Sequence, residues 1–157
     1  MDIPTPAAGR ILDVDLTAGT IATLPTSRYA EGVIGGSGIA IRAMLERIPA
    51  GTRPLDPANL MVFSAGLLVG TPAPAACRTH VAAMNALTGG YGAASAAGFF
   101  APELKYAGFD NILVSGRAEH LSYLWIEDGR AEVRDGRFLA GLTTGETEDA
   151  IHAAHGD

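Results

Sequence analysis

The sequence feature that most restricts the fold is a run of small residues, ALTGGYGAASAAG, at positions 86–98. Glycine, alanine and serine carry little apolar surface, so this segment cannot build a core by itself. The same residues allow another backbone or a ligand to approach closely, because no large side chain stands in the way. The run therefore indicates either a tight loop packed on a neighbouring backbone or a surface that a ligand approaches, and both readings stay open.

Turn-forming residues divide the rest of the chain into short elements. Alternating or continuous apolar runs predict strands, and apolar residues at helical spacing predict helices. The expected strands are 10–16, 21–24, 60–65, 79–84, 111–115, 121–126 and 131–134, and the expected helices are 27–33, 39–48, 101–107 and a terminal one. Ser27 is expected to cap the first helix, and Thr143 with Glu146 has the spacing of a capping box. Strands dominate, hairpins are frequent and helices are inserted between them. We therefore predict one α+β domain over 1–157, with mixed or antiparallel β-sheets and short inserted helices.

Charge and cysteine usage exclude several classes of protein. The net charge of -6 and the absence of any Lys/Arg cluster argue against a nucleic-acid partner. A single cysteine, Cys77, excludes an internal disulfide and any Cys₄ zinc or iron–sulfur site within the chain. The longest apolar run, 60–69, is too short for a membrane span, and MDIPTPAAGR has no signal-peptide pattern. We expect a cytoplasmic protein without a membrane partner.

The sequence contains no recognised catalytic motif, so no catalytic or metal-ligating residue is predicted. The zinc-protease, nucleophile-elbow, Walker A and C-x-x-C patterns are all absent. His152 and His155 are expected on the solvated face of a terminal helix. Glu103 is expected to interact with a helix dipole, and Cys77 to be an inert, half-buried thiol.

Glycines provide the clearest functional signal. Gly35-Gly36-Ser37-Gly38 stands directly before a long predicted helix. Such a loop offers free backbone N–H groups and the positive end of a helix dipole, which suits a phosphate. The pattern is not the dinucleotide-binding fingerprint, so it predicts anion binding only in general terms.

Six collinear segments give the chain a resemblance to a known family. They are GRILDVDLTAGTI (9–21), VIGGSGIA (33–40), PLDPANLMVFSAGLLVGTPAPAACR (54–78), NALTGGYGAASAAGFFAPELKYAGFDNILVSGRAE (85–119), YLWIEDGRAEVRD (123–135) and TTGETEDAI (143–151). In this order, and with the unusual FFAPELKYAGFD, they resemble the N-terminal domain of the tungsten-containing aldehyde:ferredoxin oxidoreductases.

The resemblance implies a cofactor and a set of residues that bind it. In the family this domain is a β-rich base for two pyranopterins that hold tungsten, or molybdenum in related enzymes, with their phosphates joined by magnesium. The small residues would let the backbone approach this flat cofactor, and no side chain would ligate the metal. The implied cofactor-binding residues are Gly36, Ser37, Gly38, Arg78, Ser95 and Gly98. Among them, Arg78 would contact the pterin phosphates through its guanidinium fork.

Departures from the family pattern weaken this expectation. Ser37 replaces an arginine of the family's G-G-R-G, and Ser95 replaces an asparagine that sits at the magnesium–phosphate bridge. Losing one charge-assisted contact costs about 1.5–3 kcal/mol, so the changes together could abolish binding. Family enzymes also continue into helical domains with four cysteines for an iron–sulfur cluster. We therefore expect that cluster only on a partner chain.

Three functions remain open. The chain is a small subunit, or separate N-terminal part, of a pterin oxidoreductase that converts aldehydes to carboxylic acids and needs a partner chain. Alternatively, it is a structural or assembly subunit with a decayed pterin site, or a repurposed enzyme or small-molecule binding module on the same fold. The expected partner is a larger subunit with the missing domains or a second copy of this chain, and a ferredoxin-type acceptor is reached only indirectly. We expect an oligomer, since an incomplete sheet leaves an exposed edge.

Overall fold

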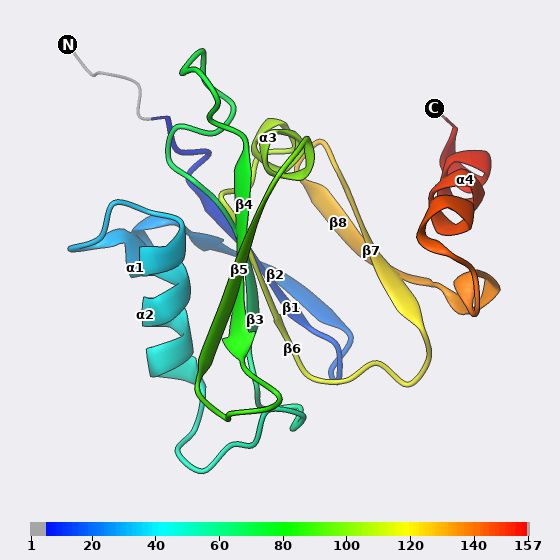
Figure 1. The fold of residues 1–157 in the computed structure, drawn as a ribbon, viewed down its shortest axis with the longest axis horizontal. Coiled ribbons are helices and arrows are strands. Elements are labelled where there is room, and N and C mark those ends of the chain that lie inside the picture. The colour runs from blue at the N-terminus through cyan, green and yellow to red at the C-terminus, as the bar shows by residue number, and fades with distance from the viewer. Residues whose placement is uncertain (1–5, 157) are drawn as a thin grey trace.

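A six-stranded sheet forms the centre of the molecule (Figure 1). The structure, a computed structural model, describes residues 6–156, so positions 1–5 and 157 of the expected domain lie outside it. The strand order is β2-β1-β6-β3-β4-β5, with β1 Arg10–Asp15, β2 Thr20–Pro25, β3 Met61–Ala65, β4 Arg78–Met84, β5 Tyr91–Ala97 and β6 Asn111–Ser115. Strands β1 and β6 are parallel and all other neighbours are antiparallel. The predicted α+β class with mixed and antiparallel sheets is confirmed.

A separate hairpin lies beside the sheet. It consists of β7 (Ser122–Glu127) and β8 (Arg130–Asp135), which pair antiparallel. Asp128 and Gly129 connect them with φ angles of 45° and 79°. Two consecutive positive φ angles suit a tight hairpin turn, and Asp-Gly is a sequence that tolerates them. The hairpin predicted from this dipeptide is therefore present.

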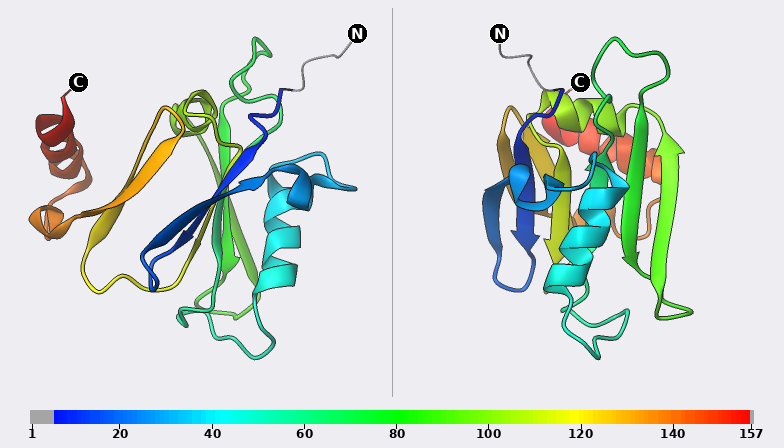
Figure 2. Two further views of the ribbon diagram at one scale, coloured as in Figure 1. Left: turned by 180° about the vertical axis from the view of Figure 1, so that it is seen from behind. Right: turned by 90° about the vertical axis from the view of Figure 1, so that its left-hand side faces the viewer.

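One face of the sheet is covered by α2 (Ser37–Arg47), and the other by α3 (Phe100–Tyr106) together with the β7–β8 hairpin. The chain also forms α1 (Ser27–Ala30), a 3₁₀ turn (Arg137–Leu139) and α4 (Thr144–His155). Figures 1 and 2 show α2 on one side of the sheet and the β7–β8 hairpin on the other. One core cluster joins α2 to β1, β3, β4 and β6, and a second joins α3 and the hairpin to the opposite face of β1 and β6. Alternation along each strand supplies both clusters, because successive side chains point to opposite faces.

Three local features differ from the sequence-based expectation or refine it. Residues 91–97, considered above as a tight loop, form the edge strand β5. The N-cap of α1 is Thr26 rather than Ser27, and it makes no side-chain capping bond. The capping box of α4 is confirmed, since the Thr143 hydroxyl accepts from the Glu146 N–H and the Glu146 carboxylate accepts from the Thr143 N–H.

A buried carboxylate ties four segments together at the start of β6. Asp110 accepts hydrogen bonds from Lys105 Nζ at 2.5 Å, Thr26 Oγ1 at 2.5 Å, Ala8 N at 2.9 Å and Gly9 N at 2.8 Å. Burial raises the pKa of Asp110, but the bonds from Lys105, Thr26 and Ala8 together outweigh it and hold that pKa below its ordinary value. The FAPELKYAGFD segment thus anchors α3 and the N-terminal segment against the sheet.

Candidate functional site

An open cavity of about 300 Å³ brings together most of the residues that the sequence singled out. Gly36, Ser37, Arg78 and Ser95 all line it. They come from the start of α2, the start of β4 and the middle of β5, which are far apart in the sequence. Other lining residues are Ile34, Gly35, Gly66, Leu67 and His80. The sheet order therefore creates a shared cavity from segments that the sequence could only consider one at a time.

The glycine loop delivers an uncapped helix N-terminus to this cavity. Gly36 is the N-cap of the 11-residue helix α2, which has no side-chain capping bond. Gly35 and Gly36 have φ angles of 142° and 51°, which a side-chain-bearing residue rarely adopts. The first N–H groups of a helix carry its positive dipole end, and in α2 one of them, Gly38 N–H, donates to the Gly35 carbonyl at 3.0 Å. This end of α2 is therefore suited to an anion.

The two remaining predicted glycines do not line the cavity. A Cβ atom on Gly38 would lie 2.8 Å from Val33 Cβ, so this glycine allows the loop to pack on the first turn of α2. Gly98 has a φ angle of 144° and no atom within 4 Å of a built Cβ, so backbone conformation is its requirement. The predicted ligand contacts of Gly38 and Gly98 have no counterpart in this cavity.

Arg78 supplies the positive charge of the cavity. It is the first residue of β4 and its side chain is exposed. Among the ion pairs of residues 6–156, none involves the Arg78 guanidinium. No carboxylate lines the cavity either. A guanidinium without an acidic neighbour is available for a planar, two-point contact with phosphate or carboxylate oxygens.

Next to Arg78, a histidine connects two hydroxyl groups of β5. His80 Nδ1 lies 3.1 Å from Ser95 Oγ, and His80 Nε2 lies 3.1 Å from Tyr91 Oη. His80 and Ser95 are register partners on β4 and β5. Burial raises the pKa of the Tyr91 phenol, which keeps its proton in place. Sequence reasoning missed His80 and Tyr91, because it did not recognise β5 as the partner of β4.

A polar row continues from His80 into the core. Ser64 pairs with His80 on one side and with Asn111 on the other, and both are fully buried. The Ser64 hydroxyl and both polar atoms of the Asn111 amide have no hydrogen-bond partner within the described part of the chain. Asn111 lines a second, smaller cavity of about 70 Å³ together with Gly35 and Gly36. Polar groups therefore extend from the open cavity to this smaller one.

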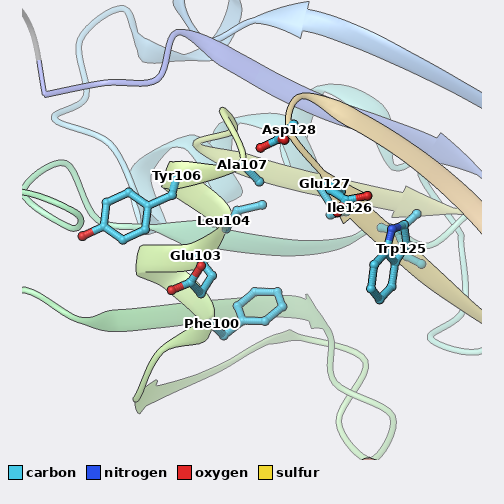
Figure 3. Close-up of a pocket in the computed structure, with 10 residues that line it drawn as sticks. Phe100, Glu103, Leu104, Tyr106, Ala107, Trp125, Ile126, Glu127 and Asp128 are labelled. Atoms are coloured by element: carbon cyan, nitrogen blue, oxygen red, sulfur yellow. The ribbon is translucent and has the colours of Figure 1, made fainter. Parts of the chain in front are cut away.

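A larger cavity lies elsewhere, between α3 and the β7–β8 hairpin (Figure 3). It measures about 420 Å³ and its lining includes the aromatic residues Phe100, Tyr106 and Trp125. Its charged residues are all acidic: Glu103, Glu127 and Asp128. In Figure 3 these three carboxylates extend from α3 and from the end of the hairpin. A polyanionic ligand would be repelled there, so the cavity beside Arg78 is the better anion site despite its smaller volume.

The remaining candidates do not form a site. Cys77 is half-buried and free. The expectation that His155 lies on a solvated face is wrong. Its ring stacks on Trp125 with ring centroids 4.0 Å apart, and its Nε2 lies 2.7 Å from Tyr123 Oη. Within residues 6–156, no three His, Cys, Asp or Glu side chains are arranged to hold a metal ion. In the same range, no helix has the length and apolar character needed to cross a membrane.

Comparison with known proteins places this geometry in context. The family profile described as "Aldehyde ferredoxin oxidoreductase, N-terminal domain" matches residues 11–157. The chain is 37% identical over 150 residues to a tungsten-containing aldehyde ferredoxin oxidoreductase of Pyrococcus abyssi, covering 95% of this chain and 25% of that protein. It is 27% identical over 138 residues to an aliphatic sulfonate oxidoreductase, WOR-like subunit, of Pyrococcus furiosus, covering 85% of this chain and 22% of that protein. The chain thus spans about a quarter of the length of these relatives.

A solved structure has the same fold. In the active site complex BamBC of benzoyl coenzyme A reductase with 1,5-dienoyl-CoA, one chain superimposes with a TM-score of 0.92 at 38% identity. The match covers 96% of this chain and 23% of that chain. The likeness thus extends over nearly all of the present chain.

Proposed function

Because this chain belongs to the aldehyde ferredoxin oxidoreductase family, matching its N-terminal domain, we propose that it helps to seat a tungsten or molybdenum pyranopterin cofactor. The reaction would be the oxidation of an aldehyde to a carboxylic acid. The helical domains and the iron–sulfur cluster would be supplied by a larger partner chain, which passes electrons to a ferredoxin-type acceptor. The observation that carries this proposal is the cavity shared by Arg78, Ser37, Ser95 and the start of α2.

The residues of this cavity fit a phosphate group. Arg78 offers a guanidinium without an internal acidic partner, and α2 offers an uncapped N-terminus. The Ser37 and Ser95 side chains line the same cavity and can donate hydroxyl hydrogen bonds. Magnesium prefers oxygen ligands, and the backbone carbonyl of Ser95 would supply one. With serine at the two positions where the family carries arginine and asparagine, Arg78 has to supply the charge.

The chain would have a holding role rather than a catalytic one. When bound, the metal pterin supplies the two-electron redox chemistry of the reaction. Arg78 would fix the phosphate end of the cofactor, and the helix dipole of α2 would stabilise its negative charge. The small side chains of β5, whose pattern of exposure is almost continuous, would let the cofactor approach the backbone of this strand.

A second candidate is a structural or assembly subunit without a cofactor. Serine in place of the family's arginine at position 37 and of its asparagine at position 95 favours it. Several large apolar side chains are also strongly exposed, including Ile34 at 85%, Leu87 at 94% and Phe99 at 83%. Together with the open edge of β5, they suit an interface with another subunit or a second copy. This surface is compatible with both candidate functions, so the presence or absence of a bound metal pterin distinguishes them.

Elemental analysis of the protein purified from its native host, with whatever copurifies, tests the proposal. We expect tungsten or molybdenum together with roughly four irons in a complex with a larger chain, since a [4Fe–4S] cluster contains four iron atoms. Arg78→Ala should lower the metal and pterin content, while Arg53→Ala, an exposed arginine outside the cavity, should leave it unchanged. A stable complex that contains neither metal nor pterin would instead establish the assembly role.

A further inference from the structure

Both ring nitrogens of the histidine beside the candidate phosphate site face a hydroxyl group of β5. Each ring nitrogen of His80 lies 3.1 Å from one hydroxyl group, Ser95 Oγ at Nδ1 and Tyr91 Oη at Nε2. A neutral imidazole has one donor and one acceptor nitrogen, so only two arrangements are possible. In one, Tyr91 donates to Nε2 and Nδ1–H donates to Ser95. In the other, Nε2–H donates to Tyr91 and the Ser95 hydroxyl donates to Nδ1.

The two arrangements differ in the hydrogen bond that the Ser95 hydroxyl can offer to a ligand in the cavity. When Nδ1–H donates to Ser95 Oγ, the serine proton is free to point into the cavity as a donor. When Ser95 donates to Nδ1, only lone pairs of its oxygen remain for the cavity. An anionic ligand held by Arg78 needs donors, so only the first arrangement adds a favourable contact.

We propose that Tyr91 and His80 orient the Ser95 hydroxyl as a hydrogen-bond donor toward a phosphate oxygen held by Arg78. This inference rests on the phosphate site of the proposed function. His80 and Tyr91 are positioning residues, because they act on the ligand through Ser95. The chain of donors runs from the Tyr91 phenol through the imidazole to the Ser95 hydroxyl, and it needs no change in the protonation of any group.

Several features of the two strands support this direction. A phenol is a better donor than an aliphatic hydroxyl, and burial keeps the Tyr91 proton on its oxygen. Tyr91, Ala93 and Ser95 share one face of β5 by alternation, with Ala93 opposite Ala82 on β4. Two alanines at this position leave space for the tyrosine and histidine rings to meet between the strands. The small residues of β5 therefore have a specific structural use.

Titration of the protein with inorganic pyrophosphate and inorganic phosphate tests the proposal. Binding is followed by NMR, with ¹⁵N shifts of the His80 ring reporting its tautomer and a His80→Gln variant assigning the signals. With pyrophosphate bound, we expect the Nδ1–H tautomer. Pyrophosphate should bind more tightly than phosphate if the site is built for a diphosphate-like ligand, whereas equal Kd values would indicate a site for a single phosphate group. The ratio of the two Kd values identifies the kind of ligand, whereas the tautomer of His80 tests the direction of the Ser95 hydrogen bond.

Variants distinguish the hydrogen-bond relay, which runs from Tyr91 through His80 to Ser95, from the phosphate site itself. Ser95→Ala should raise the pyrophosphate Kd at least about tenfold, as expected for a lost hydrogen bond to a charged ligand. Tyr91→Phe, which keeps the ring, should raise Kd roughly threefold to fivefold and shift His80 toward the Nε2–H tautomer. Tyr106→Phe is the matched control, because Tyr106 is 66% exposed on α3 and outside this cavity. It should change neither quantity.

The outcomes distinguish the two proposals. If Arg78→Ala abolishes binding but Tyr91→Phe leaves both Kd and the tautomer unchanged, the relay is wrong and the phosphate site stands. An Nε2–H tautomer at saturating pyrophosphate would likewise overturn the relay. If the wild type and Arg78→Ala fail equally to bind pyrophosphate and phosphate, the phosphate site is wrong and the relay falls with it.

Discussion

Replacing Asp110 with alanine is expected to destabilise the domain by about 3–5 kcal/mol, the range for breaking a buried ion pair. The side chains of Lys105 and Asp110 are only 6% and 5% exposed, and their charged atoms are 2.5 Å apart. Without the carboxylate, the Lys105 ammonium loses its counter-charge. The Thr26 hydroxyl and the Ala8 and Gly9 N–H groups also lose their acceptor. For a domain of this size, the loss corresponds to a decrease in Tm of roughly 6–20 °C.

Urea unfolding followed by circular dichroism measures this free energy. Glu46→Ala is the matched control, because Glu46 pairs with Arg28 at the surface, where the side chains are 43% and 52% exposed. An exposed pair contributes about 0–1 kcal/mol, so this variant should remain close to the wild type. Adding Lys105→Met to Asp110→Ala should recover part of the loss, since it removes the buried unpaired charge. Equal effects of Asp110→Ala and Glu46→Ala would refute the idea that this buried carboxylate organises the fold.

Three further predictions concern acid stability and the terminal helix. The pKa of Asp110 is lower in the folded protein than in the unfolded chain, so the stabilisation by its carboxylate is complete above about pH 3.9 and is lost as the pH falls through the folded pKa. Asp110→Asn should therefore flatten the acid part of the curve of unfolding free energy against pH. An unchanged slope in that pH range would contradict the role assigned to Asp110. Thr143→Ala should cost about 1 kcal/mol by removing the α4 capping box, seen as faster amide exchange in the first turn of α4 only. His155→Ala should release α4 from the hairpin and change Trp125 fluorescence with little effect on the main sheet, whereas an unchanged spectrum would mean that the stacking contact is not formed.

Local signals were enough to predict most strands and turns. The β7–β8 hairpin follows from a continuous apolar run before Asp128-Gly129 and alternating apolar residues after it, and the α4 start follows from Thr143 and Glu146. Strand β5 could not be predicted in this way, because YGAASAA has no apolar alternation. Its conformation depends on the hydrogen-bonded ladder with β4, which is a contact between separate segments. A ladder of this kind is set by tertiary structure and overrides weak local propensity.

In the candidate site, too, local sequence identifies some residues, while others depend on contacts between separate segments. The glycine loop was identified from its own sequence and Arg78 through the family resemblance, and the structure places them around one cavity. His80 and Tyr91 were missed, since their relation depends on the register of β4 against β5. His155 was assigned to a solvated face because its stacking partner, Trp125, lies on a different element. Contacts across elements of this kind need the fold before they can be seen.

A crystal structure of the complex purified from the native host, with anomalous data at the tungsten and molybdenum absorption edges, would test the central claim most directly. The account predicts a metal pterin whose phosphate oxygens lie within hydrogen-bonding distance of the Arg78 guanidinium, in the cavity formed with Ser37 and Ser95. A cofactor bound with its phosphates away from Arg78, or this cavity filled by side chains of a partner subunit, would contradict it.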